Sequence, residues 1–416
     1  MKDKKSGIVP KIRFPQFRSS EGWSKTALKK LADRITEKAG EEKLTTLSIS
    51  AGIGFLSQSE KFSRDISGNQ YRNYIRLEKG DFSYNKGNSK RFPQGCIYEL
   101  REYEKAAVPN AFVSFRFHPD VVSGFYKGYF ESNFHGKQLE KYITSGVRSN
   151  GLLNINAEDF FRIILPTPKE REEQQKIAAC VESLEELIRA ENKKLEALKE
   201  HKAGLMQKLF PAEEKALPEL RFGMFSGQSI AFKNGNELFE PISNKDHKCD
   251  LPVLAISQKY GAIPREKVEH NVFVSDKSLE SYKVVEIGDF IISLRSFQGG
   301  IEYSYHRGIC SPAYIILRKK ADIVDQYFRY YFKTPKFIRD LNKNLEGIRD
   351  GKMVSYSQFS ELLLPVPEQK EQERIADCLQ SIDELLAGQT AKIESLQNHK
   401  KGLLQQLFPS VEEVLK

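Results

Sequence analysis

The chain contains a long internal repeat. The segment "LPTPKEREEQQKIAACVESLEELI" begins at Leu165, and "LPVPEQKEQERIADCLQSIDELL" begins at Leu364. Each continues through a long apolar-periodic stretch to a similar end, "HKAGLMQKLFP" at Pro211 and "HKKGLLQQLFP" at Pro409, two prolines that lie 198 residues apart. Solenoid repeats have periods of about 20–50 residues, so a period of this length indicates two whole domains, each followed by its own helix.

The repeat extends into the two globular halves. "VPKIRFPQF", with Arg13, corresponds to "LPELRFGMF", with Arg221, and "LSIS" at Leu47 corresponds to "LAIS" at Leu254. The tripeptide "GDF" occurs in both halves, at residues 80–82 and 288–290. Two similar domains predict a molecule with pseudo-twofold character, which suits a partner that presents two related sites.

The two long helices follow a heptad pattern. Apolar residues fall on two neighbouring heptad positions in each repeat: Ile177, Leu184, Leu198 and Leu205 with Val181, Ile188, Leu195 and Leu209, and then Ile375, Ile382, Leu396 and Leu403 with Leu379, Leu386, Ile393 and Leu407. Two apolar positions per heptad over about four heptads indicate a coiled coil. We expect the two helices to pair antiparallel, with the polar residues Glu191 and Gln389 fixing their register.

The globular halves read as mixed structure rich in short strands. β-branched and aromatic runs such as "NAFVSFRF" and "PAYIILRK" alternate with glycine-containing turns. Short helices are expected at 23–35 and 325–342, and the aromatic clusters near Phe125 and Tyr327 look like buried helix faces. The predicted fold class is α+β, with two mixed α/β domains. The predicted boundaries are 1–165 and 212–363 for the domains and 166–211 and 364–410 for the helices.

The net charge of +9 is unevenly distributed. Residues 169–208 carry nine Lys/Arg and nine Asp/Glu, whereas residues 368–407 carry five and seven. The excess of positive charge therefore lies on the globular parts, which favours a polyanion such as a nucleic acid or a membrane surface as partner.

The sequence offers little for catalysis. It has no phosphate-binding Gly-rich loop, no nucleophile elbow and no His/Cys/Glu set with metal-ligand spacing. The five cysteines form no CxxC pair, and Cys180 and Cys378 are expected to be small core residues. No stretch is apolar enough to span a bilayer, and the start of the chain lacks the apolar core of a signal peptide, so the expected location is the cytoplasm. These features argue for binding rather than catalysis.

The arrangement resembles the specificity subunit of type I restriction–modification systems. A globular domain, a Pro-x-Pro with a Glu/Gln-rich stretch, and a heptad helix ending in Leu-Phe-Pro all occur twice. The resemblance implies that each domain is a target recognition domain for one half of a split double-stranded DNA sequence. It also implies that the helices fix the spacer, that two methyltransferase subunits dock on the helices and domain flanks, and that motor–nuclease subunits join them. Catalysis, methyl donor and ATP would belong to the partners, and no cofactor is expected here.

Base readout needs side chains that donate to and accept from base edges, and the loops after the two "GDF" motifs carry such residues. The predicted DNA contacts are Tyr84, Asn85, Lys86, Lys90 and Arg91 in the first half and Ser293, Arg295, Ser296 and Gln298 in the second, with Arg148 and Arg349 in late glycine-containing loops. Two alternatives remain open at this point. The chain could serve as the specificity module of another modification or defence system, or as a scaffold that binds only proteins.

Overall fold

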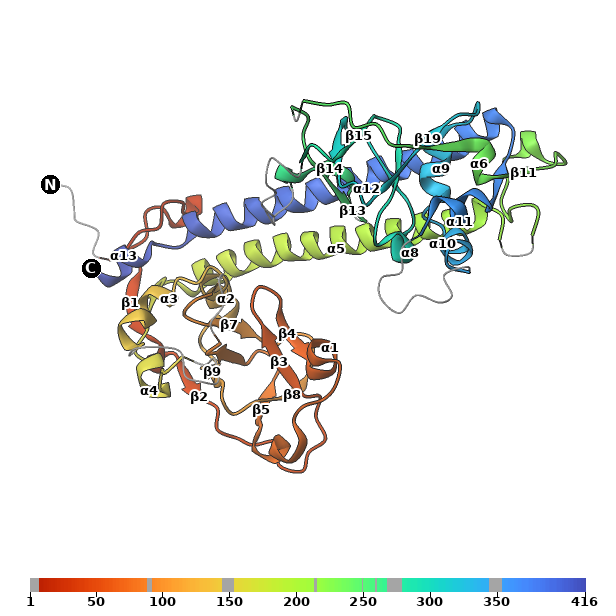
Figure 1. Ribbon diagram of the computed structural model, residues 1–416. Coiled ribbons are helices and arrows are strands. Elements are labelled where there is room, and N and C mark those ends of the chain that lie inside the picture. The colour runs from red at the N-terminus through yellow and green to blue at the C-terminus, as the bar shows by residue number, and fades with distance from the viewer. Residues whose placement is uncertain are drawn as a thin grey trace. The chain divides into compact units, whose positions relative to one another are not determined.

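The computed structural model describes residues 7–87, 92–143, 153–212, 215–248, 250–258, 260–267, 279–343 and 354–416. The chain divides into two compact units, one formed by residues 1–192 and 392–416 and the other by 193–391. Each unit contains a globular domain and part of each long helix, α5 (Arg171–Leu209) and α12 (Gln369–Leu407) (Figure 1). The first unit is therefore built from both ends of the chain.

The first domain is organised around a four-stranded sheet of order β2-β9-β6-β7. Its strands are β2 (Ala32–Arg34), β9 (Val113–Phe117), β6 (Phe82–Asn85) and β7 (Cys96–Glu99). Three antiparallel pairs accompany it: β1 (Ser24–Ala27) with β10 (Ile164–Thr167), β3 (Leu47–Ser50) with β4 (Gly54–Ser57), and β5 (Ile75–Glu78) with β8 (Lys105–Val108). The helices are α1 (Gln58–Phe62), α2 (Ser123–Glu131), α3 (Gly136–Leu139), α4 (Ala157–Phe160) and α13 (Val411–Leu415), with 3-10 turns at Pro15–Phe17, Leu28–Lys30, Gly68–Asn73 and Glu140–Tyr142.

The second domain repeats this topology. Its four-stranded sheet has the order β12-β19-β16-β17, with β12 (Phe239–Ile242), β19 (Ile315–Lys319), β16 (Phe290–Ile292) and β17 (Glu302–Tyr303). The accompanying pairs are β11 (Ala231–Asn234) with β20 (Leu363–Val366), β13 (Leu254–Ser257) with β14 (Gly261–Pro264), and β15 (Lys283–Val285) with β18 (Gly308–Cys310). The helices are α6 (Gly235–Leu238), α8 (Ser296–Gly299), α9 (Asp325–Tyr331), α10 (Pro335–Asn342) and α11 (Tyr356–Ser360), with 3-10 turns at Gly223–Phe225 and Arg265–Lys267.

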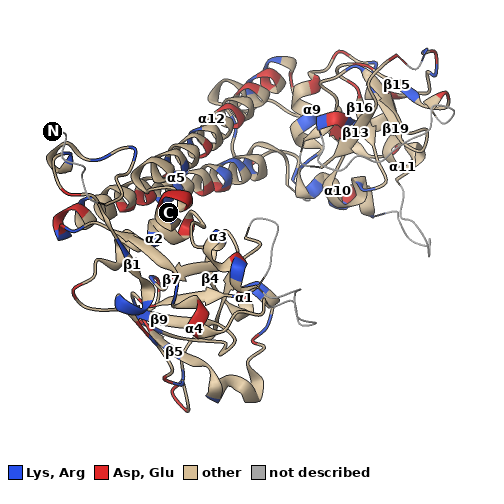
Figure 2. Cartoon of the chain, turned by 90° about the vertical axis from the view of Figure 1, so that its left-hand side faces the viewer, with Lys and Arg blue, Asp and Glu red and all other residues tan. Residues whose placement is uncertain are grey.

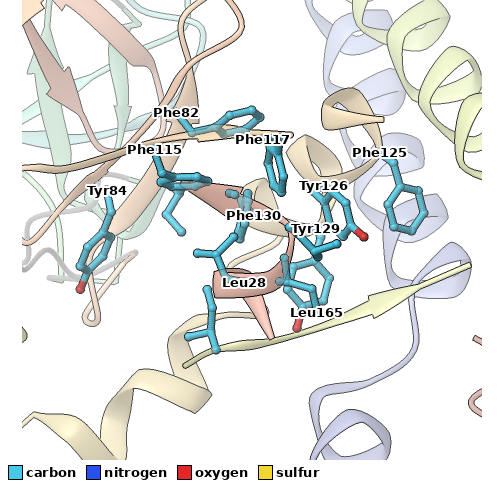
Figure 3. Close-up of a cluster of buried hydrophobic side chains, with 14 of the residues drawn as sticks. Leu28, Phe82, Tyr84, Phe115, Phe117, Phe125, Tyr126, Tyr129, Phe130 and Leu165 are labelled. Atoms are coloured by element: carbon cyan, nitrogen blue, oxygen red, sulfur yellow. The ribbon is translucent and has the colours of Figure 1, made fainter. Parts of the chain in front are cut away.

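Aromatic side chains fill the core of the first domain (Figure 3). Phe82 and Phe115 on the central strands stack at 5.5 Å, and Phe117 stacks on Tyr126 of α2 at 5.0 Å. Alternate strand residues face the same side of a sheet, which brings the rings of the sheet against one face of α2. The aromatic clusters of α2 and α9 are therefore core faces, as predicted, because their rings are buried.

The C-terminal end of each long helix packs into a domain core: the end of α12 into the first domain and the end of α5 into the second. Leu407 and Phe408 at the end of α12 belong to the core of the first domain, where Phe408 packs against Trp23 and Phe125. Leu209 and Phe210 at the end of α5 belong to the core of the second domain. A proline follows each Leu-Phe pair and cannot continue the helix. The repeated "LFP" signal is therefore both a helix stop and a core anchor.

Within each unit the two long helices run antiparallel, as expected. In the first unit Glu191 and Glu185 of α5 pair with Lys392 and Lys400 of α12, so numbering falls along one helix as it rises along the other. The heptad residues Ile177 and Val181 are buried there. Glu191 meets Lys392 at 2.5 Å, which is the type of polar contact expected to set register.

One expected element is wrong. The segment 23–35 forms β1, a 3-10 turn and β2 instead of a helix. The backbone of β1 pairs with β10, with Thr26 opposite Leu165, and Trp23 is fully buried. Long-range strand pairing here overrides the local helical spacing of apolar residues. The helices expected at 325–342 are present as α9 and α10.

In the described part of the chain no helix is long and apolar enough to cross a membrane.

Candidate nucleic-acid interface

The two Gly-Asp-Phe motifs form the same structural device at the start of the central strand of each sheet. Asp81 accepts from the backbone N–H of Glu78 and receives two hydrogen bonds from Arg116, at 2.6 and 2.8 Å. In the second domain Asp289 does the same with Arg318, at 2.8 and 2.7 Å. Both aspartates are buried and neutralised by an arginine of a neighbouring strand, so the motif fixes the turn that leads into the central strand.

In the first domain the loop residues differ in exposure. Tyr84 is fully buried in the core of the first domain (Figure 3). Its hydroxyl donates to the carbonyl of Gln94 at 2.7 Å, and its ring stacks on that of Phe160, with the ring centroids 4.7 Å apart. Burial raises its pKa well above the ordinary value. Tyr84 therefore has a role in the core of the first domain, and its contact with DNA stays a prediction.

Asn85 and Lys86 lie at the outer end of β6 and are half-buried. The Asn85 side chain donates to the carbonyl of Ile49 at 3.2 Å and accepts from the N–H of Gly87 at 2.9 Å. Its amide thus ties the loop to β3. Lys86 accepts from the N–H of Leu153 through its carbonyl. Both positions border the loop that would carry readout, but Asn85 has a structural role of its own.

In the second domain two of the four predicted residues build the turn and two project from it. Ser293 and Ser296 are buried; the Ser296 hydroxyl accepts from the backbone N–H of Ser293 at 2.8 Å. The Ser293 hydroxyl accepts from the N–H of Arg295 at 3.3 Å. The hydroxyls of both serines are used in the turn, and their contact with DNA stays a prediction. Arg295 and Gln298, at the start and within α8, are exposed and remain the candidate contacts.

Four predicted contacts, Lys90, Arg91, Arg148 and Arg349, lie outside the described residues.

The sequence analysis missed an exposed residue of the second domain that lies beside Arg295. Gln258 follows β13, and its amide donates to the carbonyl of Arg295 at 3.1 Å, with exposed Tyr260 two residues further on. The sequence could have indicated this residue, because the polar segment "QKYG" directly follows the repeated "LAIS" strand. Gln258 and Arg295 together place an amide and a guanidinium on one surface, the side-chain types that read adenine and guanine.

Three side chains of types that often act in catalysis, His135, Cys96 and Cys310, are buried in the structure. Burial lowers the pKa of His135 to about 3, so this histidine is a neutral core residue beside Tyr84 and Phe130. Burial raises the pKa of Cys96 to about 11 and that of Cys310 to about 12, which keeps both thiols protonated and unreactive. Among the residues described, no group of three or more His, Cys, Asp or Glu could hold a metal ion.

Comparison with known proteins shows which families this chain resembles. Residues 229–398 match the family model described as type I restriction modification DNA specificity domain. The chain is similar to the specificity subunits of type I restriction–modification systems. Two such relatives come from Methanocaldococcus jannaschii. The putative type I restriction enzyme MjaX specificity subunit is 25% identical over 69% of this chain and 68% of its own length. The type I restriction enzyme MjaVIII specificity subunit is 26% identical over 65% of this chain and 67% of its own.

A solved structure of the type I restriction–modification S subunit from M. genitalium shares the fold. It aligns with a TM-score of 0.55 at 15% identity, over 97% of this chain and all of that one. This similarity covers both domains and both long helices. The matched family segment, 229–398, includes the second domain's sheet and most of α12.

Proposed function

We propose that this chain is the DNA sequence-recognition subunit of a type I restriction–modification complex, and that each domain reads one part of a split target. The observation that carries the proposal is the duplicated sheet, with loops from equivalent strands β6 and β16, in a chain whose second half matches the DNA specificity domain. In the second domain that loop exposes Arg295 and Gln298. Duplicate sites on one chain fit a bipartite target.

The charge distribution supports DNA over a protein-only partner. Acidic and basic residues are interspersed along α5 and α12 (Figure 2), so the excess of positive charge belongs to the domains. Phosphate neutralisation by Lys and Arg provides much of the affinity of DNA-binding proteins. A scaffold that binds only proteins has no need for a basic excess on its domains. A specificity module of another modification system would share this feature, and the identity of the bound partner enzyme distinguishes the two.

Two methyltransferase subunits are the proposed partners, joined by motor–nuclease subunits in the restricting complex. Two exposed leucines support docking on the helices: Leu187 on α5 is 43% exposed, and Leu385 on α12 is 59% exposed. They lie 198 residues apart and are therefore equivalent positions of the repeat. An exposed leucine at the same place in both repeats is consistent with two copies of one partner. The subunit itself would carry neither catalysis nor cofactor, and it would act in the cytoplasm with no membrane partner.

The experiment is co-expression of the chain with the methyltransferase encoded beside it, followed by methylation-sensitive sequencing of host DNA. A split, asymmetric methylated motif that depends on this chain is the expected result. An Arg295→Ala variant provides a matched control, because it should degrade one half of the motif and leave the other half intact. Methylation of a continuous, unsplit motif would contradict the one-domain-per-half assignment, and methylation independent of the chain would contradict the function.

A further inference from the structure

A cluster of charged side chains joins the first domain to both long helices. Glu185 of α5 accepts from Lys127 of α2 and from Lys400 of α12, the latter at 2.5 Å. Lys400 also pairs with Glu131 of α2 at 2.7 Å. Arg101 adds contacts to Glu182 and Glu185, at 2.5 and 3.6 Å, and to Glu99. Three elements, α2, α5 and α12, therefore meet at Glu185.

The second unit repeats this meeting point. Asp383 of α12 pairs with Lys202 of α5 at 2.5 Å and with Arg329 of α9 at 3.1 Å. The hydroxyl of Tyr330, also on α9, donates to Asp383 at 2.7 Å. Asp383 follows Glu185 by 198 residues, and Lys400 follows Lys202 by the same interval, so the two clusters are equivalent parts of the repeat. In each cluster one acid holds a base of the partner helix and a base of the domain.

The pairs of the first cluster are shielded from solvent, whereas the side chains of Lys202, Asp383 and Arg329 in the second cluster are 24%, 26% and 23% exposed. The side chains of Lys127 and Glu185 are each 11% exposed. Burial alone would raise the pKa of Glu185, but Lys127 and Lys400 outweigh it and leave this pKa below the ordinary value of 4.5. Shielded pairs are screened less by salt than surface pairs. They therefore hold their geometry under conditions in which exposed ion pairs exchange freely with solvent.

A small rotation of a domain at its contact with the helices displaces the distant DNA-reading surface by a distance comparable with one base pair. A domain of about 160 residues has a radius of gyration of about 15 Å, so its reading surface lies about 20 Å or more from the joint. A rotation of about ten degrees there moves the surface by about 3.4 Å, which is the rise of one base pair. If the domain could rotate freely by this amount, the number of base pairs between the two half-sites would vary by one or more. Helix length alone cannot prevent this, because it sets the distance between the ends of the helices. The angle of the domain depends on its contacts with the helices, which are the apolar anchors at the helix ends and the charged clusters.

We propose that the clusters around Glu185 and Asp383 are the joints that fix each domain's angle on the helix pair and thereby limit the DNA spacer to one length. This inference rests on the proposed function and deepens it. Lys127 and Arg329 are positioning residues, because they act on spacing through the domain and not through contact with DNA. Their charges can be removed while the helix-to-helix pairs, Glu185 with Lys400 and Asp383 with Lys202, remain.

The test uses the full chain co-produced with its methyltransferase and carries Lys127→Gln, Arg329→Gln or both. Methylation-sensitive sequencing measures the share of sites with each spacer length. Each variant should keep the half-site sequences and raise the share of spacers one base pair longer or shorter by about tenfold, equivalent to about 1.4 kcal/mol of lost discrimination. Lys194→Gln, which neutralises an exposed lysine on α5, should leave the distribution unchanged. Glu185→Asp, which copies the residue of the second cluster, should also keep one spacer.

The outcomes separate the two proposals. If the wild-type chain yields a split motif and the variants lower total methylation with an unchanged spacer distribution, the clusters are only structural and the joint proposal is overturned. If the wild-type chain yields no split motif, the proposed function fails and the joint proposal falls with it. Should Lys127→Gln fail to accumulate in cells, Arg329→Gln tests the same claim in the other unit.

Discussion

Arg13 and Glu173 form a bidentate ion pair across 160 residues of sequence, with both contacts at 2.6 Å. The guanidinium also donates to the carbonyls of Ser20 and Glu21, at 2.9 Å each. Arg221 and Glu371 repeat the pair in the second unit at 2.6 and 2.7 Å. The "RF" opening of each domain and the Glu/Gln-rich start of each long helix are therefore two halves of one contact, which explains why both motifs recur together.

The first prediction concerns the stability that this pair confers. The Arg13 and Glu173 side chains are 6% and 0% exposed, so Arg13→Gln leaves a buried carboxylate without its partner. The first unit should lose about 3–5 kcal/mol. Trp23, the one tryptophan of the chain, lies in the core of the first unit, so its fluorescence during urea unfolding reports that unit. Lys11→Gln, at a nearby exposed lysine, should change the midpoint little; an equal effect of both would contradict the pair's role.

The second prediction separates core from readout in the first domain. Tyr84→Phe removes only the hydroxyl that donates to Gln94, so it should cost about 1 kcal/mol of stability and leave the methylated motif unchanged. Urea unfolding followed by Trp23 fluorescence measures the stability, and sequencing of host DNA measures the motif. A variant with a changed base preference and unchanged stability would show that Tyr84 takes part in DNA recognition.

The third prediction assigns the two domains to the two half-sites. Arg295→Ala should weaken recognition of one half-site by about 1–3 kcal/mol if it removes a base contact. Lys86→Ala should affect the other half-site, or weaken all sequences alike if Lys86 contacts phosphate. The measurement is binding by the assembled methyltransferase to DNA mutated in one half-site at a time. Loss at the same half-site from both substitutions would show that one domain does not serve one half.

The fourth prediction is a pH dependence centred on Glu185. Because the folded-state pKa of Glu185 is lowered below 4.5, its contribution to stability is present above pH 4.5 and is lost as pH falls through the folded pKa. Glu185→Gln lacks this contribution at any pH. The stability difference between wild type and variant, followed by Trp23 fluorescence, should therefore be largest near neutral pH and shrink below pH 4.5. Glu186→Gln, which removes an exposed carboxylate one residue away on α5, is the control for the loss of one negative charge.

The repeat was sufficient to predict the large-scale organisation. Heptads centred on residues such as Ile177 and Ile375 predicted both long helices, because an apolar stripe must be buried against a partner. The segment at 23–35 was misread because its β pairing with β10 joins residues about 140 apart in sequence, and no local pattern records such a partner. The DNA contacts stay a prediction. Proximity to "GDF" located the loops, but it could not distinguish the inward-facing Tyr84 and Ser296 from the exposed Arg295.

The last prediction tests whether the helices set the spacer. Each long helix has 39 residues and rises about 1.5 Å per residue. Insertion of one heptad after Asn192 in α5 and after Thr390 in α12, positions 198 residues apart, keeps the apolar seam in phase. Under the proposed function it should separate the two reading surfaces by about 10 Å more, which is about three base pairs of DNA.

Both insertions must be made together, because four extra residues in one helix alone would put the two halves of the pairing out of register: with Glu191 still on Lys392, Lys202 would be shifted away from Asp383. That single-helix variant is the matched control and should lose activity. The measurement is the methylated motif that each variant produces in cells. An active double-heptad variant with an unchanged spacer would show that the helices do not determine the distance between the half-sites, and the target spacing would then have to come from the domains themselves.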